Sequence, residues 1–143
     1  MQIKIKRVDK NLPLPAYKTK GAAGLDLSAR IDVKILPGKI GYIPLNVILK
    51  IPKDCFVLLA ARGSTHKLGI MPANAIGIGD ADFCGDEDEY LLAALNITKK
   101  TVVIKRGVRI AQLLVLRYEK VKFQEITKAH KISRGKFGST GQL

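Results

Sequence analysis

Short runs of alternating apolar and polar residues recur along this chain and predict a structure built from strands. Residues 1–8 alternate apolar and basic side chains, with Ile3 and Ile5 on one face. Residues 55–61 are almost all apolar, so we expect this strand to be buried on both faces. The other predicted strands are 25–29, 31–35, 43–51, 90–97, 102–104, 108–116 and 121–126.

Turn signals separate these runs at intervals of about ten residues, as in all-β proteins. Pro37-Gly38 and Arg106-Gly107 are typical turn pairs, and Pro44 favours an edge strand or a strand start. Residues 62–69 break the alternation and predict at most one helical turn. Because the strands are short and no amphipathic helix is evident, we expect an all-β sandwich or barrel, with a jelly roll favoured.

The length of 143 residues suits one domain, and an apolar fraction of 47% supplies a core. We expect this β domain to span residues 1–126. Residues 127–143 lack apolar periodicity and are rich in Gly, Ser, Lys and Arg, which predicts a flexible C-terminal arm. No long apolar run or leader is present, so we expect no membrane span, no secretion signal and a cytoplasmic location. The two cysteines lack zinc-site spacing, which favours a reducing compartment.

The net charge of +13 predicts attraction to anions. The lysines are scattered, without a basic helix or interleaved aromatic residues, so a polyphosphate ligand fits at least as well as nucleic acid, and no nucleic-acid partner is expected. Against this background, six of the 12 acidic residues fall within residues 80–89. This acidic segment is the most distinctive feature of the chain.

The glycines before the acidic segment predict a tight hairpin that presents main-chain groups and one acid to a ligand. Gly77 and Gly79 allow close approach of the backbone, and they are followed by Asp80 and Phe83. A solvated acidic loop remains an alternative. A calcium loop is disfavoured, because Leu91 stands where an EF-hand needs a bidentate Glu and no amphipathic helix flanks the loop.

Three further patterns suggest contacts with phosphate. Arg62, followed by Gly63 and Ser64, could hold a phosphate through its guanidinium and backbone N–H groups, or form a surface turn. Gln112 within an apolar strand is either a structural amide or a phosphate contact. The glycine-rich segment 134–141 could wrap a nucleotide, with Phe137 on the base, or be a linker; it lacks the spacing of a Walker P-loop.

Five blocks in this order resemble the five motifs of the trimeric deoxyuridine triphosphatases (dUTPases), over nearly the whole chain from Ile3. The blocks are 23–29, 62–67, 74–85, 107–112 and 134–141. The resemblance implies a jelly-roll homotrimer in which each active site is built from more than one subunit. It implies hydrolysis of dUTP to dUMP and pyrophosphate with Mg²⁺, which removes dUTP from the nucleotide pool and supplies dUMP for dTMP synthesis.

The resemblance also implies roles for individual residues. Asp80 would position and deprotonate the attacking water, and Phe83 would pack under the deoxyribose and exclude a 2′-hydroxyl. Asp26 would organise the site near the water shell of the metal, which the substrate phosphates and water would hold without a direct protein ligand. The implied substrate-binding residues are Arg62, Gly63, Ser64, Asn74, Gly77, Ile78, Gly79, Phe83, Gln112, Arg134, Phe137, Gly138, Ser139 and Thr140.

Several positions depart from the family pattern. Gly79 stands where Ile or a similar residue is usual, which predicts a looser hairpin; Phe83 replaces the commoner Tyr, and Gly63 replaces a Ser. A short insertion follows Gly85. The related dCTP deaminases need a Glu where this chain has Ala93, so deamination is not expected. A non-catalytic nucleotide-binding module on the same scaffold remains open.

Overall fold

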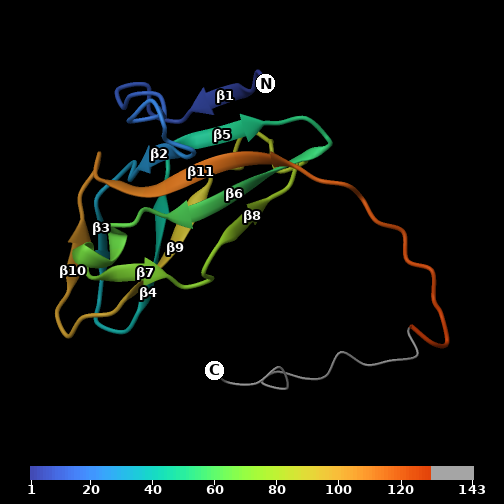
Figure 1. The fold of residues 1–143 in the computed structure, drawn as a ribbon. Helices are drawn as coiled ribbons and strands as arrows, with labels where there is room; N and C mark the ends of the chain where they lie inside the picture. Colours follow the sequence, from blue (N-terminus) through green and yellow to red (C-terminus); the bar gives the residue numbers. More distant parts are fainter. Residues whose placement is uncertain (130–143) are drawn as a thin grey trace.

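The structure, a computed structural model, describes residues 1–129 and is built almost entirely of strands (Figure 1). The predicted arm residues Arg134, Phe137, Gly138, Ser139 and Thr140 lie outside the described residues. The strands are β1 Lys4–Arg7, β2 Leu25–Ser28, β3 Val33–Ile35, β4 Ile40–Pro44, β5 Val47–Lys50, β6 Cys55–Ala61, β7 Ile70–Pro72, β8 Gly77–Gly79, β9 Leu91–Asn96, β10 Val102–Ile104 and β11 Arg109–Arg117. The expected all-β fold is therefore confirmed.

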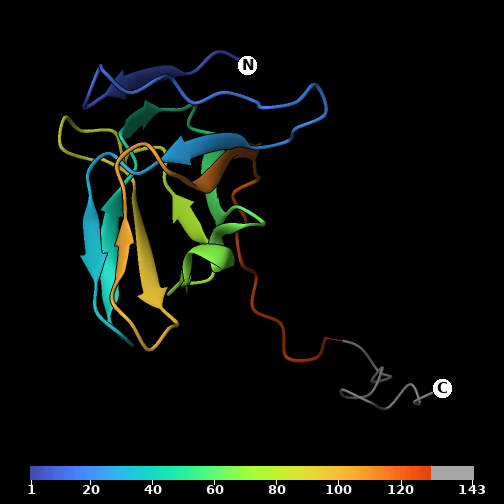
Figure 2. The same ribbon diagram turned by 90° about the vertical axis from the view of Figure 1, so that its left-hand side faces the viewer.

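The strands form antiparallel sheets with crossed connections. The largest sheet has the order β2-β11-β6-β8, a second has the order β4-β9-β7, and β1-β5 and β3-β10 form separate pairs. In Figure 2, β3, β4, β9 and β10 lie side by side along one side of the molecule. Because neighbours in each sheet are distant in sequence, the fold follows the jelly-roll type and not a simple meander.

One apolar core holds the sheets together, and strand alternation decides which side chains enter it. Cys55, Val57 and Leu59 of β6 point inward and are buried, whereas Phe56 and Leu58 on the opposite face are only half-buried. Within a single chain, therefore, only one face of this strand is fully buried, and not both faces as predicted. The second face belongs to the outer surface of the four-stranded sheet.

The predicted strand 43–51 is divided in two by a corner at Leu45–Asn46. Asn46 has a φ of 67°, in the left-handed region where Asn is among the most tolerated side chains. Its buried amide fixes the corner: Oδ1 accepts from Asp9 N at 2.6 Å, and Nδ2 donates to Asp9 O at 3.0 Å. Pro44 ends β4, which is an edge strand of its sheet, as expected. The short strands β7 and β8 were not predicted.

The predicted strand 121–126 is absent. After β11 the chain runs outward without strand partners (Figure 1), and Phe123 is 97% exposed. The predicted helical turn is present as a short 3-10 helix, η1 (Thr65–Leu68), which ends at Gly69 with a φ of 78°. No helix in residues 1–129 has the length and apolar character needed to cross a membrane.

Candidate active site

A pocket of about 360 Å³ lies beside β8 and has the size of a small-ligand site. β8 pairs with Val57–Leu59 of β6 on one side, and it forms the edge of the four-stranded sheet. The structure brings six of the predicted site residues to this pocket: Asn74, Gly77, Ile78, Gly79, Asp80 and Phe83. Leu59, Ile76, Glu89, Tyr90 and Leu91 complete its lining.

Both glycines of β8 have close neighbours, and the neighbours of Gly79 leave no room for a side chain. A Cβ at Gly77 would lie 3.3 Å from Leu59 Cβ. A Cβ at Gly79 would overlap the Tyr90 hydroxyl and lie 2.5 Å from ring carbon Cε1 of the same residue. The expectation that Gly79 loosens the hairpin therefore needs correction, because the aromatic ring of Tyr90 occupies the space that a larger side chain at position 79 would take.

Asp80 directly follows β8 and is exposed at the rim of the pocket. The backbone turns sharply after it: Phe83 N donates to Asp80 O at 3.2 Å, and Cys84 N donates to Asp82 O at 2.9 Å. These turns return Phe83 to the same pocket, where it is 38% exposed. A carboxylate and an aromatic ring thus border one cavity, and both remain accessible to a ligand.

The aromatic rings of Phe83 and Tyr90 meet edge to face, with centroids 5.3 Å apart and planes at 84°. This is a favourable aromatic arrangement, so Tyr90 braces the more exposed ring. Burial, followed by the negative charge of Asp80, raises the pKa of Tyr90 to about 12. Its hydroxyl therefore keeps its proton at neutral pH.

A second group of predicted residues gathers around Asp26 on β2. Its Oδ1 lies 3.1 Å from Arg62 Nε, and its Oδ2 lies 2.9 Å from Arg109 Nη1. The Asp26 side chain is only 11% exposed, so this carboxylate holds both guanidiniums close together. Gln112 of β11 pairs with Asp26 in register and donates from Nε2 to Ala61 O at 3.3 Å.

The turn after β6 places Gly63 and Ser64 beside the same arginines. Arg62 Nη1 donates to Ser64 Oγ at 3.4 Å and to Arg109 O at 3.3 Å. Buried Thr65 anchors the turn, because its hydroxyl donates to Ile110 O at 2.7 Å. A Cβ at Gly63 would meet nothing within 4 Å, so no neighbouring atom requires glycine there.

Sequence reasoning did not single out Arg109 or Tyr90 as site residues. Arg109 lies within the block 107–112, and its positive charge at the start of an otherwise apolar strand was a usable signal. Tyr90 gave no such signal, because its contacts with Gly79 and Phe83 arise only when β8 and the start of β9 come together.

The structure therefore sorts the predicted residues into a pocket group around Asp80 and a cationic group around Asp26. No hydrogen bond or ion pair within residues 1–129 joins the two groups. Along β6, Ala60 pairs with Gln112 and Val57 pairs with Gly79, a separation of roughly 10 Å at the usual rise of a strand.

The described carboxylates do not form a metal cage. Among residues 1–129, no group of three or more His, Cys, Asp or Glu side chains lies close enough together to hold a metal ion. Ala93, the position where a deaminase would need an acid, lies on β9 opposite Tyr42 in register.

The structure thus combines a jelly-roll type of fold with a glycine-walled pocket, an exposed carboxylate and a pair of arginines. The family model for dUTPase matches residues 10–141, and the chain belongs to the dUTPase family. The deoxyuridine 5′-triphosphate nucleotidohydrolase of Dictyoglomus turgidum is 38% identical in an alignment 148 residues long that covers 99% of each chain. That of Rhizobium johnstonii is 41% identical over 137 residues, which cover 91% of this chain and 86% of the relative.

Solved structures show the same fold. The dUTPase of Streptococcus mutans superposes with a TM-score of 0.77 and 26% identity, over 86% of this chain and 100% of that chain. The dUTPase of Staphylococcus bacteriophage 80alpha with dUPNHPP superposes with a TM-score of 0.84 and 20% identity, over 98% of each chain. A dUTPase from phage phi11 of S. aureus, described with a structural Mg(II) ion, has a TM-score of 0.80 and 17% identity over 92% of this chain and 100% of that chain.

Proposed function

We propose that this chain hydrolyses dUTP to dUMP and pyrophosphate, with the base bound beside β8 and Asp80 acting on the attacking water. The observation that carries the proposal is the exposed Asp80 carboxylate at the rim of a pocket walled by Gly77–Gly79. The reaction removes dUTP from the nucleotide pool and supplies dUMP for dTMP synthesis.

Uracil recognition would use the free edge of β8. Uracil presents an acceptor, a donor and an acceptor along one edge, and an edge strand presents N–H and C=O groups alternately. β8 pairs with β6 on one side, and its other side borders the pocket. Since glycines at both ends of β8 add no side chain, the base could approach the backbone closely.

Asp80 is suited to act as the base. Attack of water on a phosphoryl centre needs positioning, charge neutralisation and a group that takes the proton. The Asp80 carboxylate is solvent-exposed yet adjoins the pocket, so it could hold a water molecule against a bound triphosphate. Its place immediately after β8 ties the position of the base to the strand that would bind uracil.

The cationic group would bind the phosphates. Arginine guanidiniums match phosphate oxygens in geometry and charge. Arg62 and Arg109 are already held side by side by Asp26, which reduces the ordering needed when an anion binds. Gly63, Ser64 and Gln112 would add an N–H, a hydroxyl and an amide. Arg134 and the arm residues Phe137, Gly138, Ser139 and Thr140 remain proposed contacts on the basis of sequence.

Phe83 would select the deoxyribose. Its ring meets Tyr90 edge to face, so Tyr90 would support it as a wall of the sugar site. A wall packed against the 2′ carbon rejects an added hydroxyl by shape, without any tyrosine hydroxyl.

The proposal includes Mg²⁺. An ion held by the substrate phosphates and by water needs no direct protein ligand, as is usual for Mg²⁺. Asp26 is the carboxylate nearest to the proposed phosphate-binding residues and could contact the water shell. When bound, the ion would offset negative charge on the triphosphate.

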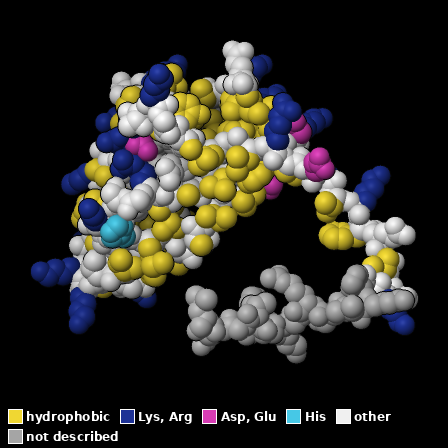
Figure 3. Space-filling view, viewed as in Figure 1, with side chains coloured by type: hydrophobic (Ala, Val, Ile, Leu, Met, Phe, Trp, Pro, Cys, Tyr) yellow, Lys and Arg dark blue, Asp and Glu magenta, His cyan; other side chains and the backbone are white. Residues whose placement is uncertain are grey.

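We also propose a homotrimer in which the pocket group of one subunit and the cationic group of another form one site. An apolar outer face supports this proposal: Phe56 and Leu58 of β6 lie beside Leu114 and Leu116 of β11. Figure 3 shows hydrophobic side chains gathered in a band across this face. Exposed apolar bands of this kind usually mark contact surfaces. Phe123 is also almost fully exposed in the single chain, and contact with another subunit would bury its ring.

The decisive experiment is pyrophosphate release from a panel of nucleotides by wild-type protein and by Asp80→Asn. Removing a positioned base costs about 10²- to 10⁴-fold in turnover, while affinity for a non-hydrolysable dUTP analogue should persist. Asp82→Asn is the matched control, because it removes the same charge two residues away and should keep most activity. Near wild-type turnover in Asp80→Asn would show that the base is elsewhere.

The shared site is tested separately. Light scattering should give three times 15.6 kDa. Inactive Arg62→Ala and Asp80→Asn proteins should regain partial activity when their subunits are exchanged, because mixed trimers would contain sites with both groups intact. No gain in activity despite proven exchange would refute the shared site.

A further inference from the structure

Tyr90 is held rigidly where three elements meet. It directly precedes β9; its N–H donates to Val47 O at 3.0 Å, and its C=O accepts from Leu45 N at 2.9 Å. These bonds tie its backbone to the corner between β4 and β5. The side chain is 5% exposed and lines the pocket that contains Asp80.

The Tyr90 ring supports the two features of the pocket on which the proposed function depends. It packs against the backbone of Gly79, where an added Cβ would lie 2.5 Å from Cε1 and 2.7 Å from Cζ. It also meets Phe83 edge to face. Any displacement of this ring would move both the strand that precedes Asp80 and the aromatic wall.

The Tyr90 hydroxyl takes no part in this support of the pocket. It is the one buried side-chain polar atom without a hydrogen-bond partner in the part of the chain that the structure describes. Burying an unpaired hydroxyl is costly, and phenylalanine would fill the same space without that cost. A buried donor that faces a ligand pocket and stays protonated at neutral pH is therefore suited to a partner present only in the substrate complex.

We propose that Tyr90 is a positioning residue for Asp80: in the nucleotide complex its hydroxyl donates a hydrogen bond to the Asp80 carboxylate and holds it toward the attacking water. The inference rests on the proposed function of Asp80. A donor to the carboxylate favours the ionised form, which is the form that accepts a proton from water. The same bond fixes the direction of an otherwise exposed side chain.

Other charged groups also face this pair. Glu89 lines the pocket with Tyr90, but its carboxylate is engaged by Arg30, and Asp88 accepts from Gly85 N. Cys84 and Asp88 contribute, with Asp80, to the field at the Tyr90 hydroxyl. Asp80 also lines a neighbouring cavity, whose other charged or ionisable lining residues include Lys50, Lys53, Asp82, Cys84 and Lys120. The test must therefore remove the Tyr90 hydroxyl alone.

Tyr90→Phe keeps the ring and removes only the hydroxyl. The kcat for dUTP should fall about tenfold, as expected for loss of a hydrogen bond to a charged group, with a smaller change in KM. Because the hydrogen bond would favour the ionised carboxylate, its loss should move the acid limb of the kcat–pH profile to higher pH. The thermal midpoint should stay equal or rise, since an unpaired buried hydroxyl is gone.

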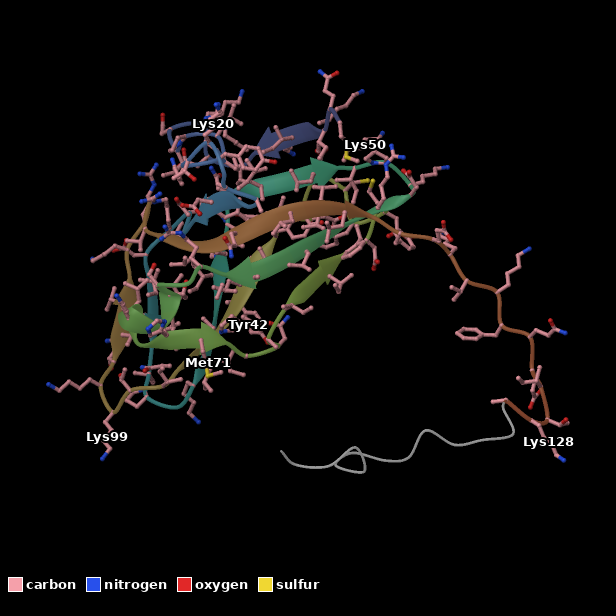
Figure 4. All side chains as sticks on the ribbon, viewed as in Figure 1. Lys20, Tyr42, Lys50, Met71, Lys99 and Lys128 are labelled. Carbon is pink, nitrogen blue, oxygen red and sulfur yellow. The ribbon has the colours of Figure 1, made fainter. Side chains whose placement is uncertain are left out.

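Tyr42→Phe is the matched control. Tyr42 of β4, labelled in Figure 4, is 66% exposed and is not among the residues that line the pocket, so the same change there should leave kcat and its pH profile unaltered. Wild-type kcat in Tyr90→Phe, or a lower kcat with an unmoved acid limb, overturns the role of Tyr90 and leaves the proposed function standing if Asp80→Asn is inactive. An active Asp80→Asn instead rejects the proposed function itself.

Discussion

Replacing Glu89 by Ala should destabilise the fold far more than any other change within the acidic insertion, residues 86–89. Glu89 accepts two hydrogen bonds from the Arg30 guanidinium and one from Asn46 N, each at 2.8 Å. The hydrogen bonds between Arg30 and Glu89 raise the pKa of Arg30 above its usual value. The insertion is therefore bonded to the corner between β4 and β5 and is not simply a solvated loop.

The magnitude follows from burial. The side chains of Glu89 and Arg30 are 12% and 26% exposed, so the pair lies between a surface and a buried ion pair. Breaking a buried pair costs about 3–5 kcal/mol, and an exposed pair contributes about 0–1 kcal/mol. Because Glu89→Ala also leaves Asn46 N without its acceptor, we expect a loss of about 2–3 kcal/mol.

The assay is urea unfolding at fixed protein concentration. It measures the urea midpoint and the slope of the unfolding free energy against urea concentration. Glu87→Ala is the matched control, since Glu87 is exposed in the same insertion and should change stability by no more than about 0.5 kcal/mol. Arg30→Ala and the double variant complete a cycle that isolates the coupling between the two side chains. Because Glu89 directly precedes Tyr90, Glu89→Ala should also lower turnover.

Equal unfolding midpoints for Glu89→Ala and Glu87→Ala would refute this reasoning. That result would mean that the insertion contributes no more than a solvated loop. A large loss with no coupling to Arg30 would locate the effect at Asn46 N alone.

Three further outcomes are expected. Phe83→Ala should raise kcat/KM for UTP relative to dUTP while Phe83→Tyr keeps the wild-type ratio, and an unchanged ratio in Phe83→Ala contradicts the proposed wall. Hydrogen bonds from Arg106, the larger cause, and from Asn11 N lower the pKa of Asp9 from its ordinary 3.8. The ionised Asp9 carboxylate therefore stabilises the fold above that pH, and this contribution is lost as pH falls through the lowered pKa. Asp9→Asn should therefore lose stability at neutral pH and respond less to acid in urea unfolding. A chain ending after Ile132 should keep its thermal midpoint and assembly but lose most turnover in the pyrophosphate assay, and full activity would exclude a role for the arm.

Local sequence was sufficient to predict that the chain is built from strands. The alternation of apolar and polar side chains can be read from neighbouring residues alone. Local sequence also located the candidate residues, since the blocks around Asp80 and Arg62 are each continuous in sequence. Their order along the chain was enough for the resemblance to dUTPases, which the comparisons confirm.

Strand pairing and side-chain contacts between distant segments were decided by the tertiary structure. Residues 121–126 alternate like a strand, yet they find no partner within the described chain, and a strand cannot exist without one. From sequence, Gly79 predicted a looser hairpin, whereas in the structure the Tyr90 ring packs against it. The ion pairs of Asp26 with Arg62 and Arg109 form because β2, β6 and β11 lie in one sheet. Periodicity records the environment of a single strand, whereas these contacts depend on which strands become neighbours in space.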